Sequence, residues 1–119
     1  EQWNLLNKEN GSQLVTGVTI VRSDFLKENE EAVKLFIEDH KASAAYTSEH
    51  LDEAAEMVAA LGIVEKAPIA KKAMPACNIV CITGEEMKSA LSGYLSVLEA
   101  ADAKSVGGQL PADDFYYLP

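Results

Sequence analysis

The feature that most constrains this chain is a run of aliphatic and β-branched residues from Leu14 to Val21. Val, Ile and Thr favour extended backbone, and a nearly continuous apolar run is typical of a strand that is covered on both faces. Such a strand needs neighbouring strands, and the rest of the sequence offers few of them. We therefore expect one main strand, at about residues 13–22, that belongs to a larger sheet.

After this run the apolar residues recur at helical spacing. Five helices are expected: a short one around Phe25, one from the N-cap Asn29 to about Thr47, one from Ser48 or His50 to a stop at Gly62, one over Ala67–Ala73, and one after Thr83. Thr83 and Glu86 have the spacing of a capping box, which makes the last helix the best marked. The predicted fold class is α/β and helix-dominated, with one main strand and about five helices.

The composition excludes several classes of function. Acidic residues outnumber basic ones 19 to 10, which gives a net charge of −9, so the chain should repel nucleic-acid phosphates and bind no nucleic acid. The longest apolar runs, such as Ile79 to Ile82, fall far below the roughly 18 residues that cross a bilayer. A length of 119 residues with 48% hydrophobic residues predicts one folded domain.

The sequence contains no recognisable catalytic or metal-binding pattern. No nucleophile is paired with a base, and no cofactor motif is visible. His40 and His50 have no matching Cys or His, so we expect a solvated His40 on a helix face and a capping or linker His50. The sequence therefore predicts a protein that is not an enzyme and that holds no metal and no cofactor.

Cys77 and Cys81 allow two interpretations. In an oxidising compartment they could close a small disulfide, but on an extended segment their Cα atoms would lie beyond the roughly 7 Å limit for that bond. Two buried free thiols are the expected state.

Several stretches resemble the type II solute-binding proteins of ABC importers. Residues 11–18 running into 21–29 resemble the return-crossover segment of that family, in which a strand is followed by Arg-x-Asp-Phe and then by Glu-Asn-Pro-Glu-Ala-Val. Here Arg22, Asp24 and Phe25 match, and Glu30 stands at the usual proline position, which a first helical position tolerates.

Further stretches carry the same resemblance. Residues 48–55 are similar to the family's Asn-Glu-Asn-Pro-Glu-Glu-Ala-Ala helix start, with Leu51 in place of proline. Residues 73–80, 84–87 and 107–117 are similar to a subgroup of nitrate, sulfonate and taurine binding proteins. Together these stretches cover nearly the whole chain.

The resemblance implies two α/β lobes with a small solute held in the cleft between them. Residues 1–119 would be the C-terminal portion of such a protein, with the crossover strand at about 13–22 and helices that complete the first lobe. The implied function is the substrate-binding component of an ABC importer for a nitrate-, sulfonate- or taurine-like solute or a thiamine precursor, with the ABC permease as partner. The implied location is extracytoplasmic, either periplasmic or as a membrane-anchored lipoprotein. The opening Glu1-Gln2, without an initiator Met or a signal sequence, also predicts part of a longer chain.

The candidate site residues follow from this resemblance. Hinge motion falls on a few residues near element ends, which makes Gly11, Ser12 and Gln13 the expected hinge. Ser12 and Gln13 are also the candidate ligand contacts. Val18 and Ile20 are expected to be buried in the sheet.

Two other functions and one association state remain open. The same fold resembles thiamine-pyrimidine-forming enzymes, in which a cleft His and Cys take part in chemistry, although neither His here matches that role. A free-standing helical interaction module would explain the number of helices but not the lone strand. Because unpaired edges seek partners, we expect the chain by itself to form a two-fold dimer through Leu14 to Val21.

Overall fold

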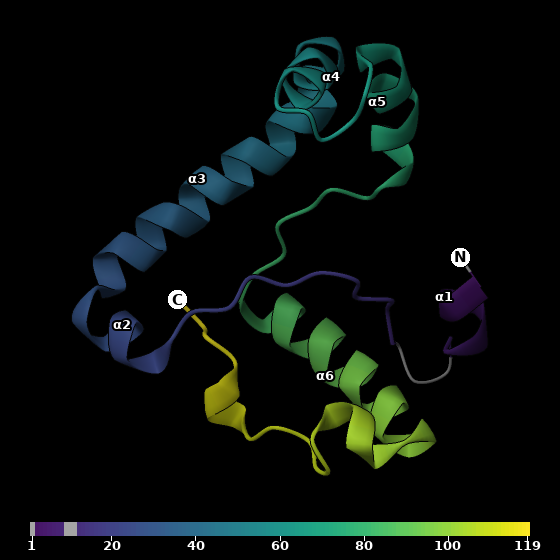
Figure 1. The fold of residues 1–119 in the computed structure, drawn as a ribbon. Helices are drawn as coiled ribbons and strands as arrows, with labels where there is room; N and C mark the ends of the chain where they lie inside the picture. The colour runs from purple at the N-terminus through teal and green to yellow at the C-terminus, as the bar shows by residue number, and fades with distance from the viewer. Residues whose placement is uncertain (1, 9–11) are drawn as a thin grey trace. The chain divides into compact units, whose positions relative to one another are not determined.

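The structure is a computed structural model that describes residues 2–8 and 12–119. Its helices, in chain order, are α1 (Gln2–Leu6), α2 (Ser23–Glu28), α3 (Glu30–Glu49), α4 (Leu51–Ala60), α5 (Ala67–Ala73) and α6 (Gly84–Ala101) (Figure 1), with 3-10 turns η1 (Met74–Ala76), η2 (Ala103–Val106) and η3 (Asp113–Phe115). They form two compact units. The central unit is Arg22–Cys81, and the terminal unit comprises the described residues of Glu1–Val21 together with Ile82–Pro119.

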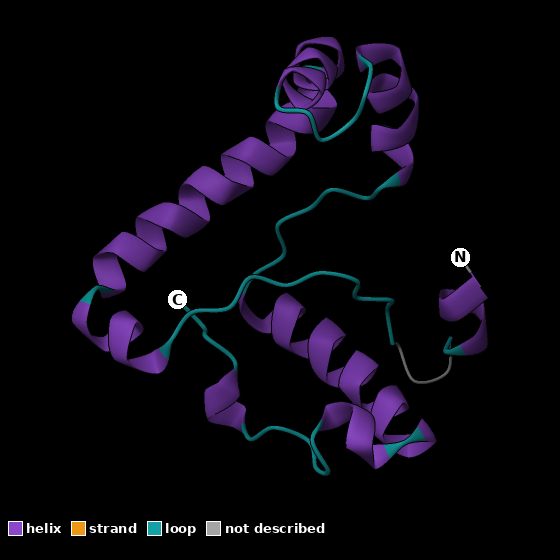
Figure 2. Cartoon of the chain, viewed as in Figure 1, coloured by secondary structure: helices purple, strands orange, loops and turns teal. Residues whose placement is uncertain are grey.

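The predicted α/β fold is wrong. Every regular element in residues 2–8 and 12–119 is helical, as the absence of strand colour in Figure 2 shows. Residues 12–22, where we expected the crossover strand, form an extended coil. Val18 is 58% exposed and Ile20 83% exposed, so their expected burial in a sheet is also contradicted. The physical reason is that a strand exists only when its N–H and C=O groups pair with a neighbouring strand, and propensity alone cannot supply one.

The predicted helix positions agree better with the structure. Helix α5 spans Ala67–Ala73 as predicted, and α3 begins directly after Asn29 but runs on to Glu49 instead of ending near Thr47. Helix α6 begins after Thr83. Neither Asn29 nor Thr83 makes a side-chain capping hydrogen bond, so the expected caps do not form. The first turns of both helices carry two acidic side chains, which the positive end of the helix dipole stabilises.

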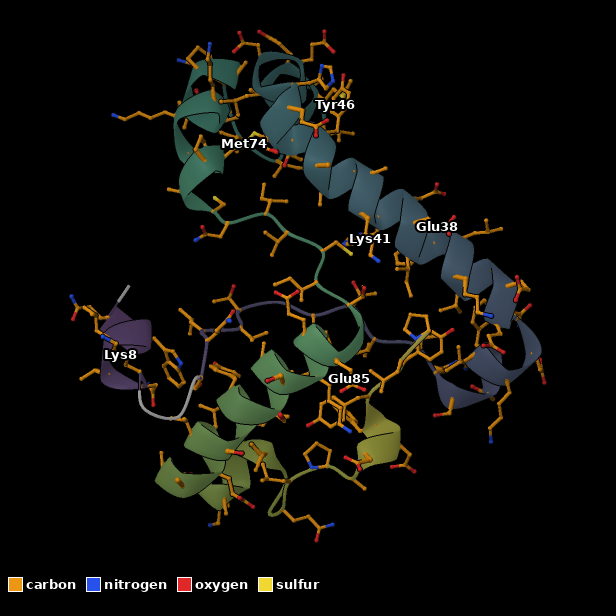
Figure 3. All side chains as sticks on the ribbon, turned by 180° about the vertical axis from the view of Figure 1, so that it is seen from behind. Lys8, Glu38, Lys41, Tyr46, Met74 and Glu85 are labelled. Carbon is orange, nitrogen blue, oxygen red and sulfur yellow. The ribbon has the colours of Figure 1, made fainter. Side chains whose placement is uncertain are left out.

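The central unit is held together by small side chains. Ala54 and Ala55 of α4 meet Ala70 of α5 and the neighbouring Met74 in one buried cluster, and four partly buried side chains pack around it: Tyr46, Leu51, Val58 and Val64. Figure 3 shows Tyr46 and Met74 near the end of α3 that adjoins this cluster. Alanine lets two helix backbones approach closely, so α4 and α5 form a tight helical hairpin. An ion pair between Asp52 and Lys71 also joins the two helices.

In the terminal unit the C-terminal tail folds back on α6. Lys88 Nζ lies 3.0 Å from Asp113 Oδ1 and 5.9 Å from the centre of the Tyr116 ring. Tyr116 is 9% exposed and meets Phe115 edge to face at 5.3 Å between ring centres. The tail therefore packs through Tyr116, whereas Phe115 stays 58% exposed.

We expect the helical hairpin to tolerate no added volume at Ala70, which is 0% exposed. Ala70→Leu forces extra methyl groups between α4 and α5 and should lower the free energy of unfolding by about 1–3 kcal/mol. Ala60→Leu is the matched control, because Ala60 lies at the exposed end of α4 and should change stability by less than about 0.5 kcal/mol. Urea unfolding followed by circular dichroism measures both. Equal losses in the two variants would contradict the hairpin.

We expect the Lys88 contact with the tail to weaken in alkali. The hydrogen bond to Asp113 raises the pKa of Lys88 above its ordinary 10.5, and burial raises the pKa of Tyr116 above 10.0. A group with a raised pKa contributes stability below its unfolded pKa and loses that contribution as the pH rises through its folded value. Lys88→Met should therefore lower the Tm at pH 8 but not well above pH 11, whereas Lys104→Met should leave it unchanged at both. A difference that persisted in strong alkali would refute this.

Candidate functional site

The predicted hinge and ligand residues lie in the terminal unit, where the extended segment begins. Ser12 is buried, with 3% of its surface exposed, whereas the neighbouring Gln13 is exposed. Gly11, the third predicted hinge residue, lies outside the described residues. Ser12 and Gln13 therefore differ sharply in environment, although the sequence suggested the same role for both.

Ser12 belongs to a small packed group, here called the Trp3 cluster: Trp3, Ser12, Gly93 and Tyr94. Trp3 Nε1 donates a hydrogen bond to Ser12 Oγ at 3.1 Å. The Trp3 ring lies 5.0 Å from the Tyr94 ring, tilted by 49°. A Cβ atom on Gly93 would lie 3.5 Å from Ser12 Cα, an ordinary van der Waals contact, so the extended segment rests on α6 at this point. The cluster thus fixes Ser12 against α1 and α6.

Sequence reasoning missed three of these four residues, although two signals were present. Trp3 is the sole tryptophan of the chain. Gly93 lies inside a helix, where glycine costs about 1 kcal/mol relative to alanine, and such a glycine usually marks a close approach. Neither signal indicates which segment makes the approach.

An open hollow of about 520 Å³ lies beside this cluster, lined by Asn7, Gly93, Ser96, Val97 and Ala100. Asn7 Nδ2 donates to the Trp3 carbonyl at 3.0 Å, and Ser96 Oγ donates to the Ser92 carbonyl at 2.8 Å. None of the five lining residues is ionisable. The hollow can accept an apolar or neutral group, and its described lining residues include no acid or base to act on it.

A second, smaller hollow of about 170 Å³ lies in the central unit between the end of α3 and η1, lined by Thr47, Ser48, Leu51, Met74 and Pro75. Both of its hydroxyl groups donate to carbonyls of the preceding helical turn, Thr47 to Ala44 at 2.7 Å and Ser48 to Ala45 at 2.9 Å. Its volume suits about one aliphatic side chain. This hollow is therefore suited to the packing of a side chain.

The two histidines stack on aromatic rings of α3. His50 lies 4.4 Å from the Tyr46 ring and His40 lies 5.6 Å from the Phe36 ring, measured between ring centres. The Tyr46 hydroxyl donates to the Glu53 carboxylate, and this bond raises the pKa of Tyr46 above its ordinary value of 10.0. Tyr46 therefore stays protonated at neutral pH and holds the start of α4 against the end of α3.

Neither cysteine forms a disulfide: both Cys77 and Cys81 are free. Cys77 is exposed and Cys81 half-buried, so the expectation of two buried thiols is wrong for Cys77. The Cys77 thiol lies 3.4 Å from the Ala73 carbonyl, as a donor to the end of α5. Cys77 follows η1 and is not part of the buried cluster of Ala54, Ala55, Ala70 and Met74.

The described residues contain neither a metal-binding group nor a membrane-spanning helix. No group of three His, Cys, Asp or Glu side chains in residues 2–8 and 12–119 is arranged to hold a metal ion. In the same residues no helix combines the length and the apolar character needed to cross a membrane.

Comparisons with protein-family models, curated proteins and solved structures found no match to this chain. The resemblance to solute-binding proteins therefore stays a prediction.

We expect Ser12 to act as a packing residue. Ser12→Ala removes the acceptor of the Trp3 indole N–H and should lower the free energy of unfolding by about 1–2 kcal/mol. Gln13→Ala is the control, because the exposed Gln13 should change stability by less than about 0.5 kcal/mol. Fluorescence of the single tryptophan during urea unfolding reports on both. If Ser12→Ala unfolded like the control, the indole bond would contribute nothing.

Proposed function

We propose that this chain is part of the substrate-binding component of an ABC importer for a small solute, either nitrate-, sulfonate- or taurine-like or a thiamine precursor. In this role the chain does not hold the solute alone. It completes a larger ligand-binding protein that passes the solute to a membrane permease. The observation that carries the proposal is the amount of apolar surface that the chain leaves uncovered.

The exposed surface is large for the mass of the chain. The accessible area is 8965 Å² for 12.8 kDa. A folded monomer of this mass exposes about 6,300 Å², and even two separate globules of half that mass would expose about 7,600 Å² together. The excess over two independent globules is therefore about 1,400 Å². A chain with this excess has surface to bury against something else.

The uncovered surface is apolar and lies on both units. Exposed large side chains include Leu14, Val18, Ile20, Leu35, Phe36, Met57, Leu61, Ile63, Ile69, Ile79 and Val80. Where such side chains lie together, they form the kind of apolar surface that binds protein. A segment that completes a larger protein is expected to present such faces.

The side chains that line the larger hollow support a role in which this chain does not bind the solute by itself. An anionic solute such as a sulfonate is held by Arg, Lys or backbone N–H donors. Among the described residues, the larger hollow presents one amide and one hydroxyl side chain, and each donates a local hydrogen bond. We therefore assign the recognition of the solute to the rest of the longer protein, and a positioning role to residues 1–119.

A free-standing helical interaction module is the second candidate. The all-helical structure of residues 2–8 and 12–119 favours it, as does the alanine-based hairpin of α4 and α5, which packs without help from a sheet. It requires a macromolecular partner for the same exposed faces instead of a solute.

Calorimetric titration tests the proposal. The natural full-length protein that contains residues 1–119 is titrated with nitrate, taurine, an alkanesulfonate and an aminopyrimidine. We expect saturable binding of one compound at one site per chain, with that compound recovered unchanged by NMR. Chemical conversion of the bound compound would indicate the thiamine-pyrimidine type of enzyme instead. Binding of none of the four, by protein shown to be folded, would sink the transport proposal and leave the interaction module.

A further inference from the structure

The backbone groups of residues 13–21 make no recorded hydrogen bond within the described part of the chain. These residues are extended, and no hydrogen bond of their side chains is recorded there either. The segment contains no proline, so every residue in it offers one N–H donor and one C=O acceptor. A row of unpaired backbone groups on an extended chain is a template for pairing with another extended chain.

The side chains of this segment also favour pairing. Six of its nine residues, Val15, Thr16, Val18, Thr19, Ile20 and Val21, are β-branched, the type that packs best on a pleated surface. Leu14 is 51% exposed, Val18 58% and Ile20 83%, so most of their apolar area is in water. These three side chains alternate along the segment, and extended backbone places them on one face.

A second copy of the same segment is a suitable occupant. The chain carries a net charge of −9, yet no residue from Ser12 to Val21 is charged, so two copies can meet here without like charges facing each other. Two-fold symmetry makes such a contact antiparallel. A register centred on Gly17 pairs the whole segment and sets Leu14 opposite Ile20 and Thr16 opposite Val18, with the uncharged pair of Gln13 and Val21 at each end.

The area available suits a dimer. A stable interface hides about 800 Å² on each partner. Two paired extended segments alone are only marginally stable in water, so a dimer must also bury neighbouring apolar surface. The excess of about 1,400 Å² per chain, counted over its whole surface, exceeds the area that such an interface hides.

We propose that the 119-residue chain forms a two-fold dimer by antiparallel pairing of residues 13–21 with the same segment of a second copy, centred near Gly17. This inference does not rest on the transport function, because it concerns the chain by itself. Solute titration of the full-length protein cannot decide it, and its failure would leave that titration unaffected.

Neighbouring prolines test the pairing. Alternate N–H groups of an extended chain point to opposite edges, so only one of Val15→Pro and Thr16→Pro removes a bond to the partner. That variant should raise the dimer Kd at least about 30-fold, about 2 kcal/mol at 1.4 kcal/mol per tenfold. The other should change the Kd much less. Ala112→Pro is the control, because Ala112 has φ −73° and no recorded bond from its N–H, and should leave the Kd unchanged.

Sedimentation equilibrium over a range of concentrations gives the Kd, and circular dichroism confirms that each variant keeps its helices. Without proline we expect a species of about 26 kDa, twice the 12.8 kDa of one chain. A protein that stayed monomeric at high concentration would overturn the proposal, as would equal effects of the two prolines.

Cysteine cross-linking gives a second, independent measurement. In a Cys77→Ser, Cys81→Ser background, Gly17→Cys would place its sulfur near its own copy, within the Cα separation of roughly 4.4–6.8 Å that a disulfide needs. Leu35→Cys on α3, also exposed, is the control. We expect Gly17→Cys to form the covalent dimer on mild oxidation and Leu35→Cys not to. Faster cross-linking through Leu35→Cys would place the contact on α3 and refute the pairing.

Discussion

The main constraint on this structure is that its helices bury few apolar side chains. The buried apolar residues of the described chain are Val33, Ala54, Ala55, Ala70, Met74, Ala90 and Tyr116, and four of these seven are alanine. An alanine contributes far less transfer free energy than a leucine, because burial stabilises roughly in proportion to apolar area. The hairpin of α4 and α5 is held by the close approach of its helices at alanine residues, and not by the burial of large side chains between them. Many large apolar side chains stay exposed, so both units keep apolar surface that another chain could cover.

The helices could be predicted because their signals are local. Helix α5 has the predicted bounds, and the residues that set them lie between Lys66 and Met74. Helix α6 begins after Thr83, as the capping spacing predicted, even though the capping hydrogen bond is absent. The strand failed for the opposite reason. Leu14 to Val21 has the composition of a strand, but a strand is a relation between two segments, and composition says nothing about the second. The fold class was therefore wrong while most helix positions were right.

The candidate site shows the same limit. Ser12 was selected by its place at the start of the extended segment, and the structure places it in the Trp3 cluster, bonded to a side chain nine positions earlier. Its partners Gly93 and Tyr94 lie far along the chain on α6. Such a contact depends on chain packing that no periodicity encodes. Gln13, predicted in the same role, lies exposed, so adjacency in sequence did not predict a shared environment.

Both proposals involve the unpaired backbone of residues 13–21. A helix pairs most of its backbone groups internally, whereas the backbone of residues 13–21 can gain protein hydrogen bonds only from another segment. A segment that pairs with a second copy cannot pair at the same edge with the rest of a longer protein. The two uses therefore compete, and by mass action the occupant with the higher effective concentration excludes the other. A covalently attached neighbour has an effective concentration near millimolar, so if residues 13–21 pair with the rest of a longer protein, that pairing is expected to exclude a second copy.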